Sequence, residues 1–232
     1  MSAQGFPGSS GAIRGAFVQL IPTLGIVTPS IVAFQYNPES ITQTISPYSP
    51  PDSDQDARTA SSPMVQPFTP DVTYSFALEL DATDKLEEAN PLAVVAGVAP
   101  QLASFKKLVE ASKGAFGDLI ASAQALAGGA AAAIERPEVP ITLMVLGPGT
   151  ILPIRITSYS VELTEFSPAL YPVMAKITLE LIVVPPEQFR CKTTPGKDLA
   201  IAAYNLTALQ DDALAVADAV DSAISTVAKL PI

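Results

Sequence analysis

The segment ITLMVLGPGTILPIRITSYSVELTEFSPALYPVMAKITLELIVV, residues 141–184, decides the fold. It contains three apolar or alternating runs, at residues 141–146, 151–163 and 173–184. Gly-Pro-Gly at residues 147–149 predicts a tight turn between the first two runs. The third run alternates between two sets of side chains: Val173, Ala175, Ile177, Leu179, Leu181 and Val183 against Met174, Lys176, Thr178 and Glu180. This period of two predicts a half-buried strand, and the segment as a whole predicts a mainly antiparallel sheet.

Upstream runs supply partner strands for this segment. VTYSFALEL, residues 72–80, alternates as cleanly as the third run does. Residues 14–20 and 31–36 read as two further strands, and residues 41–45 as a weaker one. The intervening IPTLGIVTPS, residues 21–30, is punctuated by proline and glycine and predicts a loop. Residues 46–70 contain six prolines and predict a long loop, of a length usually reserved for partner contacts or mobile segments.

Two segments have helical spacing. A helix is predicted at about residues 100–127, with Leu102, Phe105 and Leu108 on one face. Residues 197–229 form a second amphipathic pattern, with acidic residues opposite the apolar stripe. The chain therefore predicts an α+β fold, in which an antiparallel sheet curled into a barrel or sandwich carries one inserted flanking helix and a C-terminal helical tail.

The composition argues against nucleic-acid binding and against the commonest catalytic machinery. The 232 residues include 13 Lys and Arg against 23 Asp and Glu, a net charge of −10, whereas nucleic-acid binding needs clustered cations. Histidine, the commonest general base and metal ligand, does not occur. Cys191 is the only cysteine, which excludes an internal disulfide and predicts a partly buried small residue rather than a nucleophile.

Targeting signals are not evident in the sequence. The first residues, MSAQGFPGSSGAIRG, lack the charged start and apolar core of a Sec-type signal peptide. The most apolar tract, residues 121–134, is mostly alanine and shorter than the about 20 residues that cross a bilayer. We therefore expect a chain made in the cytoplasm, without direct membrane insertion.

Short motifs that suggest ligand binding have simpler interpretations. The glycines of GSSG and GPG match neither of the phosphate-binding glycine loops. The acidic run DSDQD, residues 52–56, lacks the following Gly and the distal Glu of a calcium loop. Ser40, Ser158 and Ser160 have no base beside them in the sequence. No cofactor and no metal ion are expected.

A cluster of carboxylates follows the strand at residues 72–80. Asp81, Asp84, Glu87 and Glu88 are close in sequence, and paired carboxylates can perform acid–base catalysis. Helix capping explains them more simply, with Asp81 or Thr83 as N-cap and acids in the first turn. We expect no enzyme, and a hydrolase using Asp81, Asp84 or Glu87 is the weakest of three hypotheses.

Several stretches resemble, in order, one known family. They are FQYNPESI at residues 34–41, FALELDATD at residues 76–84, PQLASFKKLVE at residues 100–110, and residues 140–181 with their L-P-I-R and T-E-F-S-P-A-L-Y-P elements. The series is similar to the tube-protein-like N-terminal domain of contractile injection system baseplate proteins, over about residues 14–186. The matched residues are Asn37, Pro38, Glu39, Arg58, Asp81, Thr83, Asp84, Pro153, Arg155, Glu165, Phe166 and Pro172.

The resemblance implies a phage-tail-tube-like β-barrel at residues 14–190, between a flexible start at residues 1–13 and a helical tail at residues 191–232. It implies a homo-hexameric ring at the baseplate hub of a phage-like or extracellular contractile particle used for secretion. The implied partners are inner tube proteins, the spike trimer and other baseplate subunits. The implied role is mechanical, that of a tube initiator and spike adaptor.

The matched residues also have physical interpretations. Asn37 and Pro38 suit a strand end. Glu39 either caps the following backbone or pairs with Arg58 or Arg155. Arg155 and Glu165 lie ten residues apart on one predicted strand and so share a face by its period of two. The polar residues of the alternating strands (Thr73, Ser75, Thr178 and Glu180) are expected to face a wetted lumen.

The family's relatives usually carry a C-terminal LysM module, and here the match is faint. TPGKDLAIAAYNL, residues 194–206, only weakly resembles the LysM elements, and a helix is predicted after it. Leu146 replaces a Trp expected near the turn at Gly147. The alternative function is therefore a cell-wall-binding accessory module with a degenerate LysM-like tail. The tail either packs on its own barrel or docks on another baseplate protein.

Overall fold

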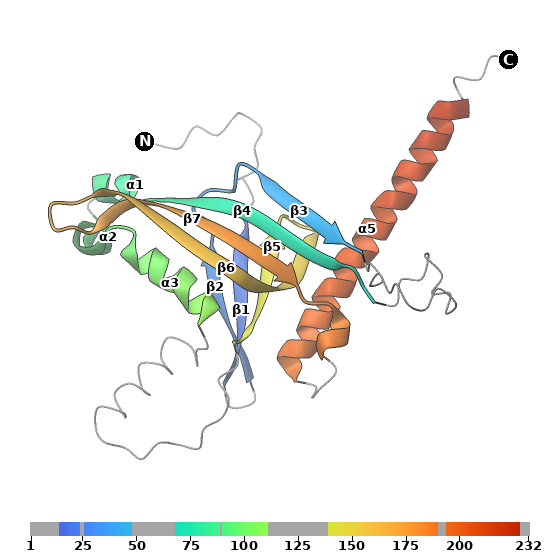
Figure 1. Cartoon of the computed structure of the whole chain (residues 1–232), viewed down its shortest axis with the longest axis horizontal. Helices are drawn as coiled ribbons and strands as arrows, with labels where there is room; N and C mark the ends of the chain where they lie inside the picture. Colours follow the sequence, from blue (N-terminus) through green and yellow to red (C-terminus); the bar gives the residue numbers. More distant parts are fainter. Residues whose placement is uncertain are drawn as a thin grey trace, which may run out of the picture. The chain divides into compact units, whose positions relative to one another are not determined.

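The computed structural model describes residues 14–23, 26–47, 68–88, 90–110, 139–189 and 194–227. These residues form an α+β fold with a seven-stranded sheet in the order β2-β1-β5-β6-β7-β4-β3 (Figure 1). The residue pairings of β1–β2, β1–β5, β3–β4, β4–β7 and β6–β7 are all antiparallel, which confirms the predicted class. Across the described strands the sheet is open between β2 and β3, so the predicted barrel is not confirmed.

The chain divides into two compact units. Unit 1 comprises Met1–Phe34, Ser104–Pro153 and Pro186–Ile232, and unit 2 comprises Gln35–Ala103 and Ile154–Pro185. Strand β6 (Thr150–Phe166) begins in unit 1 and continues in unit 2, and α3 (Ala99–Val109) begins in unit 2 and ends in unit 1.

Unit 1 contains β1 (Ala16–Thr23), β2 (Ile26–Ala33) and β5 (Ile141–Leu146). The loop predicted at residues 21–30 is wrong, because β1 and β2 pair throughout, from Ala16↔Ala33 to Thr23↔Ile26. Both prolines of that stretch occupy places where a strand tolerates them. Pro29 lies on β2, the end strand of the sheet, and Pro22 lies beyond Leu20, where the pairing of β1 with β5 stops.

Three phenylalanines form the centre of the unit 1 core. The ring centroid of Phe17 lies 5.0 Å from that of Phe34 and 6.3 Å from that of Phe105, both edge to face. All three side chains are buried, and each contributes about 1.5–3 kcal/mol by its burial. Gly15 lies against them, since a Cβ there would come within 2.6 Å of the Phe34 ring. The FQYNPE stretch therefore begins with a core residue, Phe34, and the missing side chain of Gly15 leaves space for the Phe34 ring.

Helix α5 (Pro195–Val227) confirms the predicted helical tail. It follows the short 3-10 helix η1 (Pro186–Phe189) and packs within unit 1 against η1, β5, β1 and β2. Only small residues at its start are buried, namely Gly196, Ala200, Ala203 and Thr207. The Thr207 hydroxyl accepts from the amide N–H of Ile151 at 2.9 Å and lies 2.9 Å from the Ile151 carbonyl oxygen. One threonine therefore fastens the helix to the start of β6.

Unit 2 contains β3 (Ile41–Ser46), β4 (Asp71–Asp81), the long part of β6, and β7 (Pro172–Val183). The predicted alternation of β4 and β7 is confirmed. Phe76 lies opposite Leu179 and Leu78 opposite Ile177, and all four side chains are buried. These cross-strand apolar pairs fix the register, since a slip of one residue would expose every one of them.

Helix α1 (Thr83–Glu87) and α2 (Pro91–Ala96) precede α3 and were not separately predicted. Asn90 begins α2, because its side-chain oxygen accepts from the amides of Leu92 and Ala93 and Pro91 occupies the first turn. The helix predicted at about residues 100–127 is confirmed as far as Val109. Its remainder lies outside the described residues, as do residues 1–13, the acidic run at 52–56, Arg58, the tract at 121–134 and Cys191.

Candidate functional site

One face of unit 2 is rich in hydroxyl groups, and we call it the polar face. It comprises Thr42, Thr44, Thr73, Ser75, Ser158, Ser160, Thr164 and Thr178 with the charged residues Glu79, Arg155, Glu162, Lys176 and Glu180. These residues lie side by side in register: Glu180, for example, lies opposite both Ser75 and Ser158. Nearly all of them are exposed. The four residues expected to face a lumen are therefore on one wetted face.

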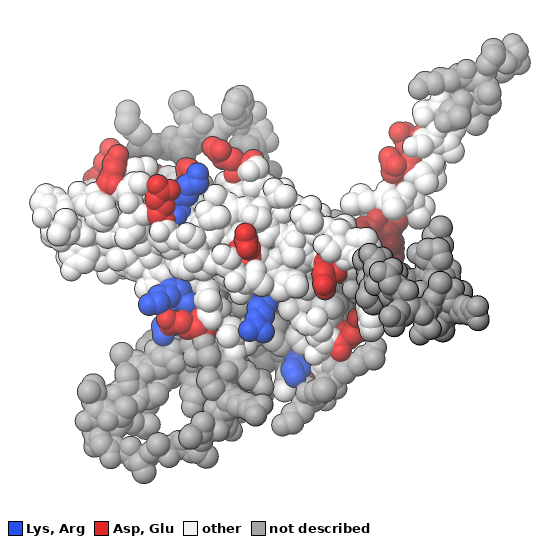
Figure 2. Space-filling view, viewed as in Figure 1, with Lys and Arg blue, Asp and Glu red and all other residues white. Residues whose placement is uncertain are grey.

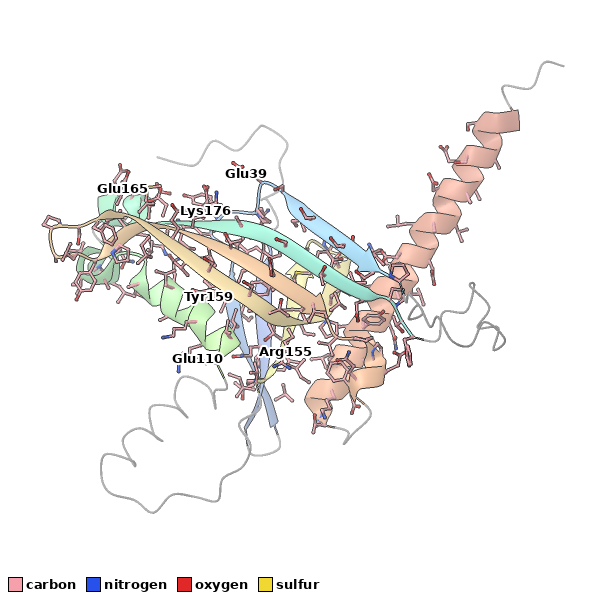
Figure 3. All side chains as sticks on the ribbon, viewed as in Figure 1. Glu39, Glu110, Arg155, Tyr159, Glu165 and Lys176 are labelled. Atoms are coloured by element: carbon pink, nitrogen blue, oxygen red, sulfur yellow. The ribbon has the colours of Figure 1, made fainter. Side chains whose placement is uncertain are left out.

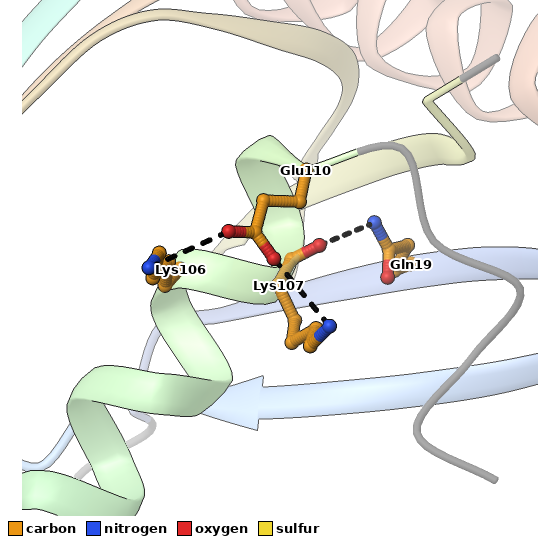
Figure 4. A network of polar contacts seen from close by, with 4 residues as sticks. All are labelled: Gln19, Lys106, Lys107 and Glu110. Carbon is orange, nitrogen blue, oxygen red and sulfur yellow. Dashed lines mark hydrogen bonds and ion pairs between the residues drawn. The ribbon is translucent and has the colours of Figure 1, made fainter. Parts of the chain in front are cut away.

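The charges of the polar face alternate in sign across the strands. Lys176 of β7 lies opposite Glu79 of β4 and opposite Glu162 of β6. Figure 3 places Lys176 in the middle strands of unit 2. Among the residues that the structure describes, the ion pairs within 4 Å are Lys106–Glu110 and Lys107–Glu110 at the end of α3 (Figure 4). The face is thus polar and of mixed sign, without a built anion or cation site.

The expected shared face of Arg155 and Glu165 is wrong. A β-bulge between Ile156 and Ser158 shifts the register, so that Arg155 and Ser158 lie on the polar face and Glu165 does not. Ten residues of strand separate the two by about 30 Å, and Figure 3 shows them far apart on β6. Neither forms an ion pair with a described residue. The period of two was interrupted by an extra residue that the sequence did not reveal.

The hairpin that joins β6 to β7 ends in exposed apolar side chains. Phe166, Leu170 and Tyr171 are exposed at its tip, and Leu92, Val94 and Val95 are exposed on α2. The carbonyl of Pro172 accepts from the Val98 amide at 2.9 Å, which joins the base of this hairpin to the turn after α2. We call these six residues the apolar end. In Figure 2 the surface of this end of unit 2, at the left, is mainly uncharged.

The hairpin tip has an unusual backbone. Glu165 and Leu170 have positive φ angles of 50° and 62°, which non-glycine residues rarely adopt. Ser167 holds the tip closed, since its N–H donates to the Tyr171 carbonyl at 2.8 Å and its hydroxyl accepts from the Tyr171 amide at 3.2 Å. Such strain is commonly found at functional sites. The matched element T-E-F-S-P-A-L-Y-P is therefore a shaped, exposed apolar projection.

The link Asn37-Pro38-Glu39 lies between β2 and β3, beyond the last strand residue Ala33. Glu39 forms no ion pair with Arg155, and its other expected partner, Arg58, lies outside the described residues. The link is held instead by Gln35, which sequence reasoning missed. Its side-chain amide donates to the Asp81 carbonyl at 2.6 Å and accepts from the Asp81 amide at 3.1 Å.

The carboxylate cluster lies at the start of α1, but the prediction of Asp81 or Thr83 as N-cap is wrong, because Ala82 is the N-cap and no side chain caps the helix there. The Asp81 carboxylate accepts from the Thr83 amide at 2.7 Å and from the Thr83 hydroxyl at 2.6 Å, at the start of α1. Asp84 lies in the first turn of α1, where the helix dipole favours an acid. Asp84 and Glu87 are exposed. Among the described residues no group of His, Cys, Asp and Glu is arranged to hold a metal ion.

Strand β3 ends the sheet in unit 2 and is exposed at every residue. Its sequence, ITQTIS, contains no charged residue and no proline. Both are devices by which edge strands avoid pairing with other chains. The strand at the other end, β2, carries Pro29. Among the residues that the structure describes, no strand pairs with the outer edge of β3.

Comparison with models of protein families and with curated proteins gives no match. No described helix is both long and apolar enough to cross a membrane. The residues compared with LysM, 194–206, lie in the start of α5 apart from Thr194, and the strand of a LysM module is not formed there. Pro153 and Pro172, the remaining matched prolines, are buried.

Proposed function

We propose that this chain is a structural subunit of a contractile injection system, a tube-initiating baseplate adaptor that joins the inner tube to the spike. Three surfaces of the molecule support the proposal, and each suits contact with other subunits. They are the polar face, the uncharged edge of β3 and the apolar end. The ordered resemblance in the sequence supplies the identity of the particle.

The observation that carries the proposal is the edge of β3 beside a polar face. A sheet with one buried face and one hydroxyl-rich face, open at an unprotected edge, extends by pairing with the sheet of another copy. When the β3 edge of one copy meets a different surface of the next copy, the pairing is head to tail and closes into a ring when the rotation allows it. In a ring the polar faces line a wetted lumen, and the ring completes the tube-like barrel.

The apolar end suits contact with another layer of the particle. Six exposed apolar side chains within one end of unit 2 form a larger group than scattered surface residues do. Its shaped backbone around Leu170 is rigid enough to enter a partner's pocket. In the proposed assembly the apolar end contacts the spike or the first tube ring, and the particle assembles in the cytoplasm.

The ring is tested by electron microscopy of the purified chain, with an edge variant as comparison. Ile45→Lys places a charge on the exposed edge strand, and Ala208→Lys adds the same charge on the exposed side of α5. The proposal expects six-membered rings for the wild type and for Ala208→Lys, and their loss for Ile45→Lys. Rings that persist in Ile45→Lys would contradict pairing through β3.

No observation favours the alternative of peptidoglycan binding, because the LysM-like stretch forms part of one continuous helix. The hydrolase hypothesis gains no support either, because the Asp81 carboxylate is engaged by Thr83 at the start of α1.

A further inference from the structure

Unit 1 buries side chains from only the first part of helix α5. Its buried residues (Gly196, Ala200, Ala203 and Thr207) end at Thr207, and every residue from Ala208 to Ala223 is exposed. The helix has 33 residues, so these 16 residues, about half of its length, have no contact that buries a side chain in the described structure. Most helical stability in proteins comes from a packed apolar face, which this part of α5 lacks among the described residues.

Eight of the exposed apolar residues of α5 are regularly spaced. Leu199, Ala202, Leu206, Leu209, Ala213, Val216, Val220 and Ala223 are separated alternately by three and four residues. We call these eight residues the seam. Its large side chains are exposed, from 49% at Leu199 to 70% at Leu209. A repeat of 3.5 residues sustained over three heptads matches a supercoiled helical partner, whereas a helix on a flat surface follows a period of 3.6.

The charges of α5 indicate what kind of helix can cover the seam. In heptad terms, with Leu206 at position a, Asp211 and Asp218 occupy the outward f positions and Asp221 occupies a b position. Two acids, Asp198 and Asp212, lie at flanking g positions, and the described part of α5 beyond Lys197 contains no Lys or Arg. A basic partner helix would find only these two flanking acids to pair with, each worth at most about 1 kcal/mol at the surface.

A second copy of α5 fits these positions without conflict. In a parallel, in-register pair, a g residue lies beside the e residue five positions later in the partner. Asp212 then lies beside Ala217, and Asn205 beside Gln210, so no like charges meet at the flanks. The outward acids of the two helices are kept apart by more than the about 8 Å over which charges interact at physiological salt.

We infer that the exposed seam of α5 is a self-association surface, on which a second copy of this chain packs as a parallel, in-register coiled coil. The inference does not rest on the proposed function. It concerns the isolated chain and uses residues of unit 1, whereas the β3 edge belongs to unit 2.

Two matched leucine variants test this inference. Leu209→Glu changes a seam residue, and Leu214→Glu changes an equally exposed leucine of the same helix that lies off the seam. Sedimentation equilibrium of the full chain measures the monomer–dimer dissociation constant. We expect Leu209→Glu to raise the constant at least tenfold and Leu214→Glu to change it less than twofold. Because both side chains are exposed, circular dichroism should be the same for both variants.

The ionic strength and a cysteine pair give two independent readouts. Because each copy carries a net charge of −10, raising the salt from 50 to about 300 mM should strengthen the association, whereas pairing through opposite charges weakens with salt. In a Cys191→Ser background, Val216→Cys should form an intermolecular disulfide on oxidation, and Asp218→Cys should not. A chain that stays monomeric to about 100 µM, or equal effects of the two glutamates, would overturn the inference. A Val216→Cys variant that does not cross-link would overturn the parallel register.

Discussion

At the scale of single residues, side chains that bond to backbone fasten the ends of the strands. Thr207 reaches both backbone groups of Ile151, and Gln35 reaches both backbone groups of Asp81. Removing one partner of a buried hydrogen bond leaves the other unsatisfied, at a cost of about 1–3 kcal/mol.

Thr207→Val is therefore expected to lower the free energy of unfolding by about 1–3 kcal/mol, because the isosteric side chain leaves the N–H and C=O of Ile151 unpaired. Thr207→Ser keeps the hydroxyl and should cost clearly less. Urea unfolding followed by circular dichroism measures both. Equal losses in the two variants would mean that packing, and not the hydroxyl, fastens α5.

Gln35→Met is expected to destabilise unit 2 by about 1–2 kcal/mol, because the backbone N–H and C=O of Asp81 then lose their partner. Gln43→Met, an exposed residue on β3, is the matched control and should change stability by less than about 0.5 kcal/mol. If the two substitutions had the same effect, Gln35 would not be the residue that holds the link.

Two tyrosines make stability depend on alkaline pH. Burial raises the pKa of Tyr159, and burial together with the nearby Glu187 carboxylate raises the pKa of Tyr204. A raised folded-state pKa means that the stability is fully present below pH 10 and is lost as the pH rises through the folded-state value. Tyr159→Phe with Tyr204→Phe should flatten the fall in unfolding free energy between pH 9 and 11. If the unfolding free energy of the double variant fell with pH as steeply as that of the wild type, the two tyrosines would not be the cause of the alkaline pH dependence.

At the scale of elements, alternation predicted well wherever one face is buried. The strands β4 and β7 and their buried faces follow from the period of two, and α5 from its apolar stripe. The strands through Pro22 and Pro29 were missed, because proline is a breaker in sequence but is tolerated at the end of a sheet. The bulge at Ile156–Ser158 was missed for a different reason, since no residue type marks it.

The hairpin tip gives the prediction that belongs to this scale. Leu170 adopts a left-handed conformation that costs about 1–2 kcal/mol for most residues. Leu170→Gly should relieve that cost and leave the isolated chain as stable or more stable, yet weaken binding of the apolar end to its partner in a pull-down from assembled particles. If the Leu170→Gly chain binds its partner as the wild type does, the hairpin tip is not part of the interface.

At the scale of the whole molecule, the fold class was predictable and the closed barrel was not confirmed. The sheet has two ends, β2 and β3, and strand patterns in one chain cannot say whether an end meets the other end or a second copy. The matched site residues also differ in whether the structure brings them together. Asp81 and Thr83 lie together, while Arg155 and Glu165 are separated by the bulge. Residues that contact other subunits carry no local signature, because their partners lie outside the chain.

Electron microscopy of particles assembled with and without this chain tests the adaptor role most directly. The account predicts that particles lacking the chain show spike and tube as separate objects, and that restoring the wild-type chain joins them. The Ile45→Lys chain, altered at the exposed β3 edge, should fail to restore them. Complete particles, with tube joined to spike in the absence of this chain, would contradict the account.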